Sequence, residues 1–255
     1  MQPAAPVSAD GLWVWDGAQW VPNPQRPTYG PGWMASYESA SFRAMMTTLF
    51  LALNIIGVAL FLIFDGLDII NISEGRPQDA LYTAEGLVAL LGLLAYLGSF
   101  IPAVVFFCMW VHRVVRNMPA LGSPDPRWTP GGAVGRSFIP VMNLWHPLYS
   151  VLDVWRGSWA GRRWVDVSAR KAIAAPFLIV AWWSSWLGAR LVSWIGSILG
   201  RANPNDVPIQ VTSIGIDAIG NVVLVAAAVL AILVVRDVTA RQERKNELIA
   251  SGQLV

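Results

Sequence analysis

The sequence is poor in charge, in histidine and in cysteine. Its one cysteine, Cys108, excludes an intramolecular disulfide and any cysteine-based metal cluster. Its two histidines occur without an H-E-x-x-H pattern, so no metal site is expected. Only 13% of the residues are charged, against about 25% in soluble domains, which leaves too few charges to coat a water-facing surface. The net charge of +2 gives no argument for nucleic acid as a partner.

Patterns typical of enzymes are also missing. The sequence has no phosphate loop, no dinucleotide fingerprint, no G-x-S-x-G and no paired acids within an apolar run. Its first 42 residues lack a charged start followed by an apolar core, so no cleavable signal peptide is expected. We therefore expect a non-enzymatic protein without a cofactor.

What the chain has instead is long apolar runs. Hydrophobic residues make up 55% of it, and 14 residues are tryptophan, which is enriched where membrane meets water. A hydrocarbon core of about 30 Å needs a helix of about 20 apolar residues. We therefore predict an all-α membrane protein with four transmembrane helices. The predicted spans are residues 45–64, 86–111, 172–194 and 218–235.

Prolines and acidic residues predict how these helices begin and bend. Pro102 is expected to kink the second span, and Pro176 to lie in the first turn of the third. A polar loop over residues 201–216 is expected before Asp217, which would open the fourth helix. Residues 236–255 are expected to form the solvated end of that helix.

Polar side chains are few within the spans. Asn54, Ser99 and Ser184 fall near mid-membrane on three spans, where such groups usually hydrogen-bond between helices. A polar path for a solute is the alternative. Arg190 follows the third apolar run and is expected to snorkel to the interface. No charged residue is expected deep in a span, although energised transporters usually need one.

Basic residues predict the sidedness of the spans. With the N-terminus inside, 15 of the 18 Lys and Arg residues are cytoplasmic, leaving only Arg76, Arg190 and Arg201 for the other side. Cytoplasmic loops are the ones rich in Lys and Arg. We therefore expect a multi-pass membrane protein with both termini in the cytoplasm.

Pro140 and Pro147 divide the stretch between the second and third spans into short apolar runs. A fifth span over residues 131–155 would bury an Arg and an Asp, each costing about 3 kcal/mol at mid-membrane. We predict instead a broken helical hairpin over residues 130–158, which is re-entrant or lies on the cytoplasmic surface. Its residues 138–143 are expected to sit against the helix bundle, because irregular backbone avoids lipid.

The N-terminal residues 1–32 predict a small Trp-rich β-hairpin and a Pro-rich linker, followed by a transmembrane domain (33–240) and a tail (241–255). An Asp16-Gly17 turn favours a two-residue hairpin loop, which would set Trp13 opposite Trp20 and Trp15 opposite Ala18. Two roles remain open for Trp13, Trp15 and Trp20: they form the core of the hairpin, or they dock a partner protein.

Basic and polar side chains gather at the end of the second span and in the central hairpin. Such clusters beside a span bind anions or lipid headgroups. The candidate site consists of His112, Arg113, Arg116, Asn117, Arg136, Asn143, His146 and Arg156. Structural roles are the alternative: the cations stabilise a helix C-terminus, Asn143 caps the next helical arm, and His146 lies at the interface.

The central stretch resembles an uncharacterised bacterial membrane family, domain-of-unknown-function family 4328, over roughly residues 45–240. The N-terminal segment is similar to a W-x-W-D-G-x-x-W module found at the ends of many bacterial membrane proteins. The family resemblance implies a multi-spanning membrane protein and no activity. The matching residues are Trp110, Arg113, Asn117, Trp128-Thr129-Pro130-Gly131, Phe138-Ile139-Pro140-Val141-Met142-Asn143-Leu144, Pro147 and Trp155-Arg156.

Three functions follow as hypotheses. The first is a membrane scaffold or sensor that contacts membrane lipids and recruits a cytoplasmic or membrane protein partner through the hairpin and the N-terminal module. The second is a passive solute or lipid transporter that uses the break at Asn143. The third is an enzyme acting on lipid with His112 or His146 as base.

Overall fold

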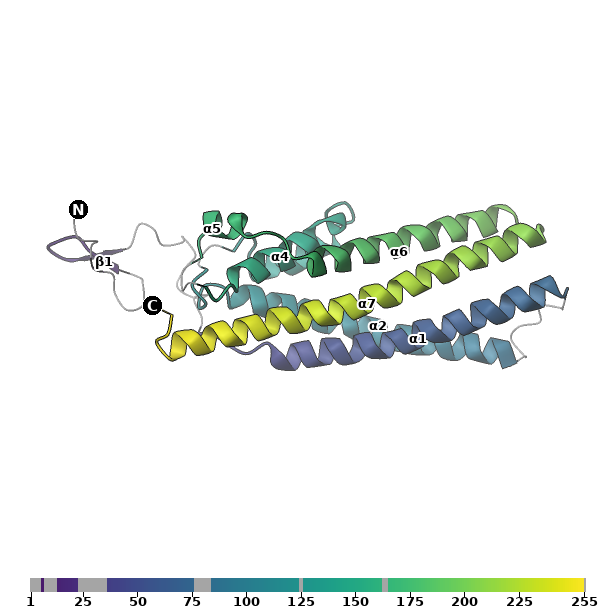
Figure 1. Ribbon diagram of the computed structural model, residues 1–255, viewed down its shortest axis with the longest axis horizontal. Coiled ribbons are helices and arrows are strands. Elements are labelled where there is room, and N and C mark those ends of the chain that lie inside the picture. Colours follow the sequence, from purple (N-terminus) through teal and green to yellow (C-terminus); the bar gives the residue numbers. More distant parts are fainter. Residues whose placement is uncertain are drawn as a thin grey trace.

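The computed structural model describes residues 6, 13–22, 36–75, 84–123, 126–161 and 165–254 (Figure 1). Most of the predicted linker lies outside these residues. The elements are β1 (Trp13–Trp15), β2 (Trp20–Pro22), α1 (Ser41–Ser73), α2 (Ala84–Arg116), α3 (Pro130–Gly135), the short 3-10 helices η2 (Arg136–Phe138) and η3 (Met142–Leu144), α4 (His146–Gly157), α5 (Val167–Ala172), α6 (Phe177–Ala202) and α7 (Val207–Ala250).

Four long helices lie side by side (Figure 1). α1 pairs with α2, α6 pairs with α7, and α1 also packs along α7. Within the described residues, α1, α2 and α7 are each long and apolar enough to cross a membrane. The predicted mostly helical protein with a small β-hairpin is thus confirmed, together with three membrane-capable helices.

The helix ends differ from the predictions in two places. The prediction of a polar loop over residues 201–216 is wrong, since α7 already begins at Val207. The helix begins there because the Asp206 carboxylate accepts the N–H of Ile209 at 3.0 Å and Pro208 occupies the first turn. Pro176 also precedes α6 as its N-cap residue rather than lying in its first turn.

The end of α7 is only partly solvated, which corrects the prediction that residues 236–255 are its solvated end. Gln242 and Lys245 are fully buried. The Gln242 amide donates to the Val114 carbonyl at 2.8 Å, and Lys245 Nζ donates to the Gly157 carbonyl at 3.0 Å. One face of the charged tail therefore packs on the ends of α2 and α4.

The β-hairpin forms with a different register. Trp15 pairs with Trp20, and Trp13 pairs with Pro22, so the loop has four residues rather than two. The cause is the Asp16 carboxylate, which accepts the N–H groups of Ala18 and Gln19, both at 2.8 Å. The Trp15 and Trp20 rings meet edge-on with centroids 5.6 Å apart. The Trp13 side chain lies outside the described part of the chain.

The central hairpin is broken as its prolines predict, into α3, η2, η3 and α4. The expectation that residues 138–143 sit against the bundle is met only in part. Phe138 and Asn143 line a cavity shared with the long helices, but Phe138 and Val141 are each 64% exposed, and Ile139 is 47% exposed. α3 and α4 bury their own inward residues, including Ala133 and Val151. The turn between them consequently leaves much of its apolar side-chain surface exposed.

Candidate functional site

An apolar cavity of about 370 Å³ lies between the long helices and the central hairpin. All four long helices line it, as do α3, η2, η3 and the start of α4. Its volume is in the range of small-molecule sites, which are typically about 300–1,000 Å³. Ala227, Ala228 and Ala231 form its α7 wall, where small side chains leave the space open.

A polar contact between α1 and α2 borders this cavity. The Asn54 side-chain amide, which lines the cavity, donates to Ser99 Oγ at 3.1 Å and to the Tyr96 carbonyl at 3.3 Å. The interhelical role predicted for Asn54 and Ser99 is therefore observed. Ser184 is exposed on α6 and does not line the cavity.

Arg190 supplies the cavity with a positive charge. α6 continues to Ala202, so Arg190 lies near the middle of this helix and not at its end. Its Nη2 donates to the Tyr96 hydroxyl at 3.1 Å, and its guanidinium lies 5.8 Å from the Trp186 ring centroid. Among the described residues no carboxylate forms an ion pair with it.

The residues of the predicted anion site lie in three separate places. The first is a group of polar contacts at the end of α2. Arg113 forms an ion pair with Glu38. The Asn117 amide donates to the Glu38 carbonyl at 2.8 Å and to Gln242 Oε1 at 3.1 Å. These contacts join α2 to α7 and to the residues before α1. His112 is exposed and Arg116 half-buried on the same helix end.

The second part lies inside the hairpin, around His146. Its Nε2 is 3.1 Å from the Ala133 carbonyl, and its ring packs on Trp128 with centroids 4.9 Å apart. The Arg136 guanidinium lies 4.3 Å from the Trp128 ring centroid. Burial lowers the pKa of His146, and Arg136 and Arg127 lower it further, while hydrogen bonding to the backbone opposes them. The arrangement keeps a neutral imidazole in the hairpin core.

Asn143 does not cap the helical arm that follows it. The N-cap of α4 is Trp145, and Asn143 lines the apolar cavity together with Ser137 and Phe138. The break in the hairpin thus contributes directly to the cavity wall.

The third part is a second cavity of about 430 Å³, which Arg156 shares with residues that the sequence did not single out. Its charged lining residues are Arg127, Asp153, Arg156, Arg170 and Lys171. The only signal in the sequence was the spacing of Tyr149, Asp153 and Arg156 along one helix face. The sequence-based prediction includes Arg190 but places it after the apolar run, whereas the helix continues beyond it to Ala202.

Comparison with protein families agrees with the resemblance seen in the central stretch. A family model described as Domain of unknown function (DUF4328) matches residues 74–240. No curated protein and no solved structure matches the chain.

Proposed function

The chain belongs to the DUF4328 family, and we propose that it is a membrane sensor that binds an anionic amphiphile in its apolar cavity. The observation that carries the proposal is a cavity shared by four long helices and the hairpin, with Arg190 at its wall. The amphiphile would be a fatty acid or an anionic lipid, and the hairpin would report its presence to a protein partner.

The apolar lining accounts for the tail of such a ligand. Phe100, Phe107 and Trp182 are among the side chains that face the cavity. Each methylene group moved from water into such a site contributes about 0.8 kcal/mol. A chain already dissolved in lipid gains less, so shape and the polar end of the ligand must supply selectivity.

Arg190 accounts for the negative charge of the ligand. The Arg190 side chain is exposed on the bundle near the middle of α6, so a membrane around α6 would surround it with a low dielectric. A guanidinium there is costly without a counter-charge, and its present contacts are a hydroxyl and an aromatic ring. A carboxylate or phosphate matches the planar guanidinium through two parallel hydrogen bonds. An anionic headgroup at the cavity would therefore compensate Arg190 as well as anchor the tail.

Coupling to the cytoplasmic side follows from the shared wall. Ala133, Phe138, Asn143 and Pro147 belong to the hairpin and line the same cavity as α1, α2, α6 and α7. A ligand that fits one hairpin arrangement better than another shifts the population of the two. The exposed apolar turn at Phe138 and Val141 would then rest in the membrane surface or on a partner.

The membrane arrangement belongs to the same proposal. α6 serves as a fourth crossing beside α1, α2 and α7, both termini face the cytoplasm of a bacterial cell, and no catalysis is involved. α6 has 26 residues, or about 39 Å at 1.5 Å per residue, which is enough to cross. The Trp-rich β-hairpin, through Trp15 and Trp20, is a docking element for a protein partner.

The test fills the cavity from α7 with a matched control. Ala228 lines the cavity, whereas Ala226 is exposed on the same helix. Native mass spectrometry of the purified protein, loaded with oleate, is expected to show bound oleate in the wild type and in Ala226→Phe but not in Ala228→Phe. Equal oleate retention in the two variants would contradict the proposed cavity site.

Arg190→Gln tests the charge of the ligand, with Arg201→Gln at the exposed end of α6 as control. We expect Arg190→Gln alone to weaken oleate retention about tenfold, since a charge-assisted hydrogen bond contributes roughly 1.5–3 kcal/mol. If Arg190→Gln retains oleate at the wild-type level, the ligand does not need a negative charge to bind.

A passive lipid transporter is the second candidate, favoured by one observation: Asn54 in α1 and Asn143 in the hairpin line the same cavity. A liposome assay with fluorescent phosphatidylglycerol separates the two. Movement of the probe between leaflets that Ala228→Phe abolishes would favour transport, and static binding would favour the sensor.

A further inference from the structure

The second cavity lies on the opposite face of α4 from the bundle core. Tyr149, Leu152, Asp153 and Arg156 recur at spacings of three and four along this face and line the cavity. Ser150, Val151 and Val154 are buried on the other face. α5, through Arg170 and Lys171, and the segment Pro126–Arg127 form the remaining walls. This site is independent of the proposed apolar cavity.

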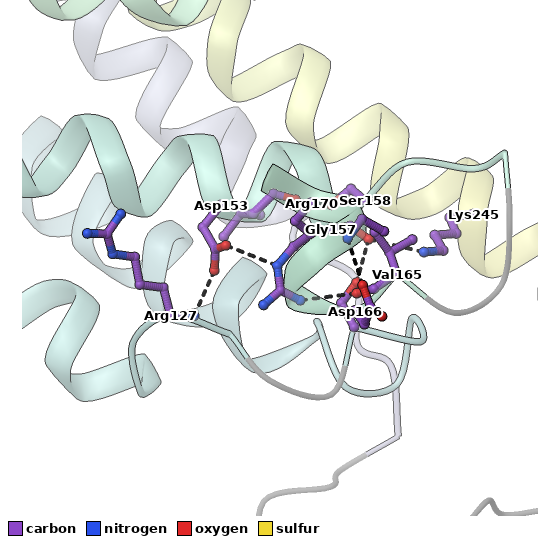
Figure 2. Close-up of polar contacts among 11 residues, drawn as sticks. Arg127, Asp153, Gly157, Ser158, Val165, Asp166, Arg170 and Lys245 are labelled. Carbon is purple, nitrogen blue, oxygen red and sulfur yellow. Dashed lines mark hydrogen bonds and ion pairs between the residues drawn. The ribbon is translucent and has the colours of Figure 1, made fainter. Parts of the chain in front are cut away.

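Asp153 is the only carboxylate among the described residues that line this cavity, and both of its oxygens are in use. Oδ1 accepts from Arg170 Nε at 3.1 Å, and Oδ2 accepts from the backbone N–H of Arg127 at 2.8 Å (Figure 2). Arg170 also donates to the Val165 carbonyl at 3.1 Å. Asp153 and Arg170 therefore neutralise each other and hold the walls in place.

Three cations remain around the cavity, namely Arg127, Arg156 and Lys171. Within the described residues none of them forms an ion pair. The Arg127 guanidinium lies 4.9 Å from the Tyr149 ring centroid and 5.2 Å from that of Trp128. These rings orient the guanidinium without occupying its N–H donors.

Arg156 adds an unfulfilled donor to this arrangement. Its Nε is buried and has no hydrogen-bond partner among the described residues. A buried donor left without a partner costs about 1–3 kcal/mol, and more when it is charged. Arg156 itself lines the cavity, so an anion there would face its guanidinium.

The geometry points to a phosphate-binding site formed by Arg127, Arg156 and Lys171. A phosphate group has several strong acceptor oxygens and up to two negative charges, which three surrounding cations match. Two arginines suit its oxygens through their planar forks, and the lysine adds a point charge. The phosphate is that of a lipid headgroup or of a free water-soluble compound, because the cavity has room for more than the phosphate alone.

The experiment uses the full-length protein in two arms. In a detergent without phosphate, calorimetry measures the dissociation constant of inorganic phosphate, with chloride as the comparison anion. In the second arm, the protein is placed in phosphatidylcholine nanodiscs that contain phosphatidic acid. Native mass spectrometry then counts the phosphatidic acid molecules that stay bound when the protein is released from the nanodisc.

Lys171→Gln and Arg156→Gln are the test variants, and Arg244→Gln is the control. Arg244 is an exposed residue of α7 that pairs with Glu247 outside the cavity. Its substitution therefore removes one positive charge without changing the lining of the cavity. Lys171 is exposed, so its substitution should not disturb folding and decides the result if Arg156→Gln does not fold. We expect each test variant to bind about tenfold more weakly, and the control to bind like the wild type.

The two arms distinguish the sources of the phosphate. Site-dependent binding of inorganic phosphate supports a free phosphate compound as ligand, and site-dependent retention of phosphatidic acid alone supports a lipid headgroup. Failure of the wild type to bind either probe, or equal binding by the test variants, overturns the site. Ala228→Phe is expected to keep phosphate binding, which separates this result from that of the apolar cavity.

Discussion

Single side chains of this protein are held in environments that constrain their charge. His146 is buried, its Nε2 lies 3.1 Å from the Ala133 carbonyl, and its Nδ1 has no partner in the described part of the chain. The pKa of His146 is lowered mainly by burial and secondarily by Arg136 and Arg127. The imidazole is therefore neutral at pH 7, and protonation of Nδ1 would place an N–H where no acceptor is available among the described residues.

The first expectation concerns pH. The pKa of His146 is lower in the folded state than in the unfolded state, where it is about 6.5. Its contribution to stability is thus complete above pH 6.5 and is lost as the pH falls towards the folded-state pKa. Thermal unfolding in detergent is expected to show a smaller loss of Tm between pH 7.5 and 5.5 in His146→Gln than in the wild type.

His112→Gln is the comparison variant, because His112 is the only other histidine. It lies beside Arg113 and Arg116, which disfavour its protonation, so the two variants measure the contributions of the two histidines separately. An unchanged pH dependence in His146→Gln would show that other groups control acid unfolding.

Lys245 gives a second expectation at this scale. Its fully buried ammonium has the Gly157 carbonyl as a partner, and that carbonyl also accepts from Ser123 Oγ at 2.9 Å (Figure 2). Replacing a buried ion pair by apolar side chains is often neutral or stabilising by about 1–4 kcal/mol, and Lys245 has no ion-pair partner among the described residues that its removal would leave buried and unpaired. We expect Lys245→Met to raise the Tm in detergent, whereas Arg244→Met at the neighbouring exposed position leaves it unchanged. A fall in Tm would mean that the ammonium stabilises the fold.

At the scale of elements, close packing of α1 on α2 depends on a glycine. A Cβ at Gly57 would lie 2.7 Å from the Tyr96 backbone nitrogen and 2.9 Å from its Cα. Backbone atoms cannot move aside as a flexible side chain does, so the two helices approach closely only because this position has no side chain. The same contact brings Asn54 to Ser99.

The third expectation follows from this approach. Gly57→Ala should force α1 and α2 apart and destabilise the protein by about 1–3 kcal/mol. Gly66→Ala on the same helix has open space around its new Cβ and should stabilise by up to about 1 kcal/mol through helix propensity. Thermal unfolding of both variants in one detergent measures the difference, and similar Tm values would argue against close helix contact in solution.

At the scale of the whole molecule, the turn between α6 and α7 lies at the opposite end of the bundle from the C-terminus (Figure 1). α7 joins these two ends and is apolar enough to cross a membrane. With four crossings and the N-terminus in the cytoplasm, as proposed above, the turn at Asn205 faces the exterior and Ser251 faces the cytoplasm. With only α1, α2 and α7 crossing, the two positions are reversed.

The fourth expectation uses this difference. In a Cys108→Ser background, Asn205→Cys should react with a membrane-impermeant maleimide in intact cells, and Ser251→Cys only after permeabilisation. Cys108 is the only native cysteine, so the background is free of other thiols. The reversed labelling pattern would contradict four crossings with a cytoplasmic N-terminus.

The sequence by itself determined the class of the protein and the approximate position of its long helices. Hydropathy is a local property, and runs such as residues 45–64 and 218–235 are apolar whatever they contact. The break of the central hairpin was equally predictable, because Pro140 and Pro147 restrict the backbone locally. The helix limits were less accurate, since a cap such as Asp206 extends a helix into polar sequence.

Only the tertiary structure decided which side chains meet. Arg190 and Tyr96, or Asp153 and Arg170, come together through the packing of separate elements, and no local pattern encodes that distance. The register of the β-hairpin likewise depended on two hydrogen bonds to Asp16 that compete with the expected turn. The cavities arise for the same physical reason: they are spaces left between helices, and their shape is set by how all the contacting side chains pack at once.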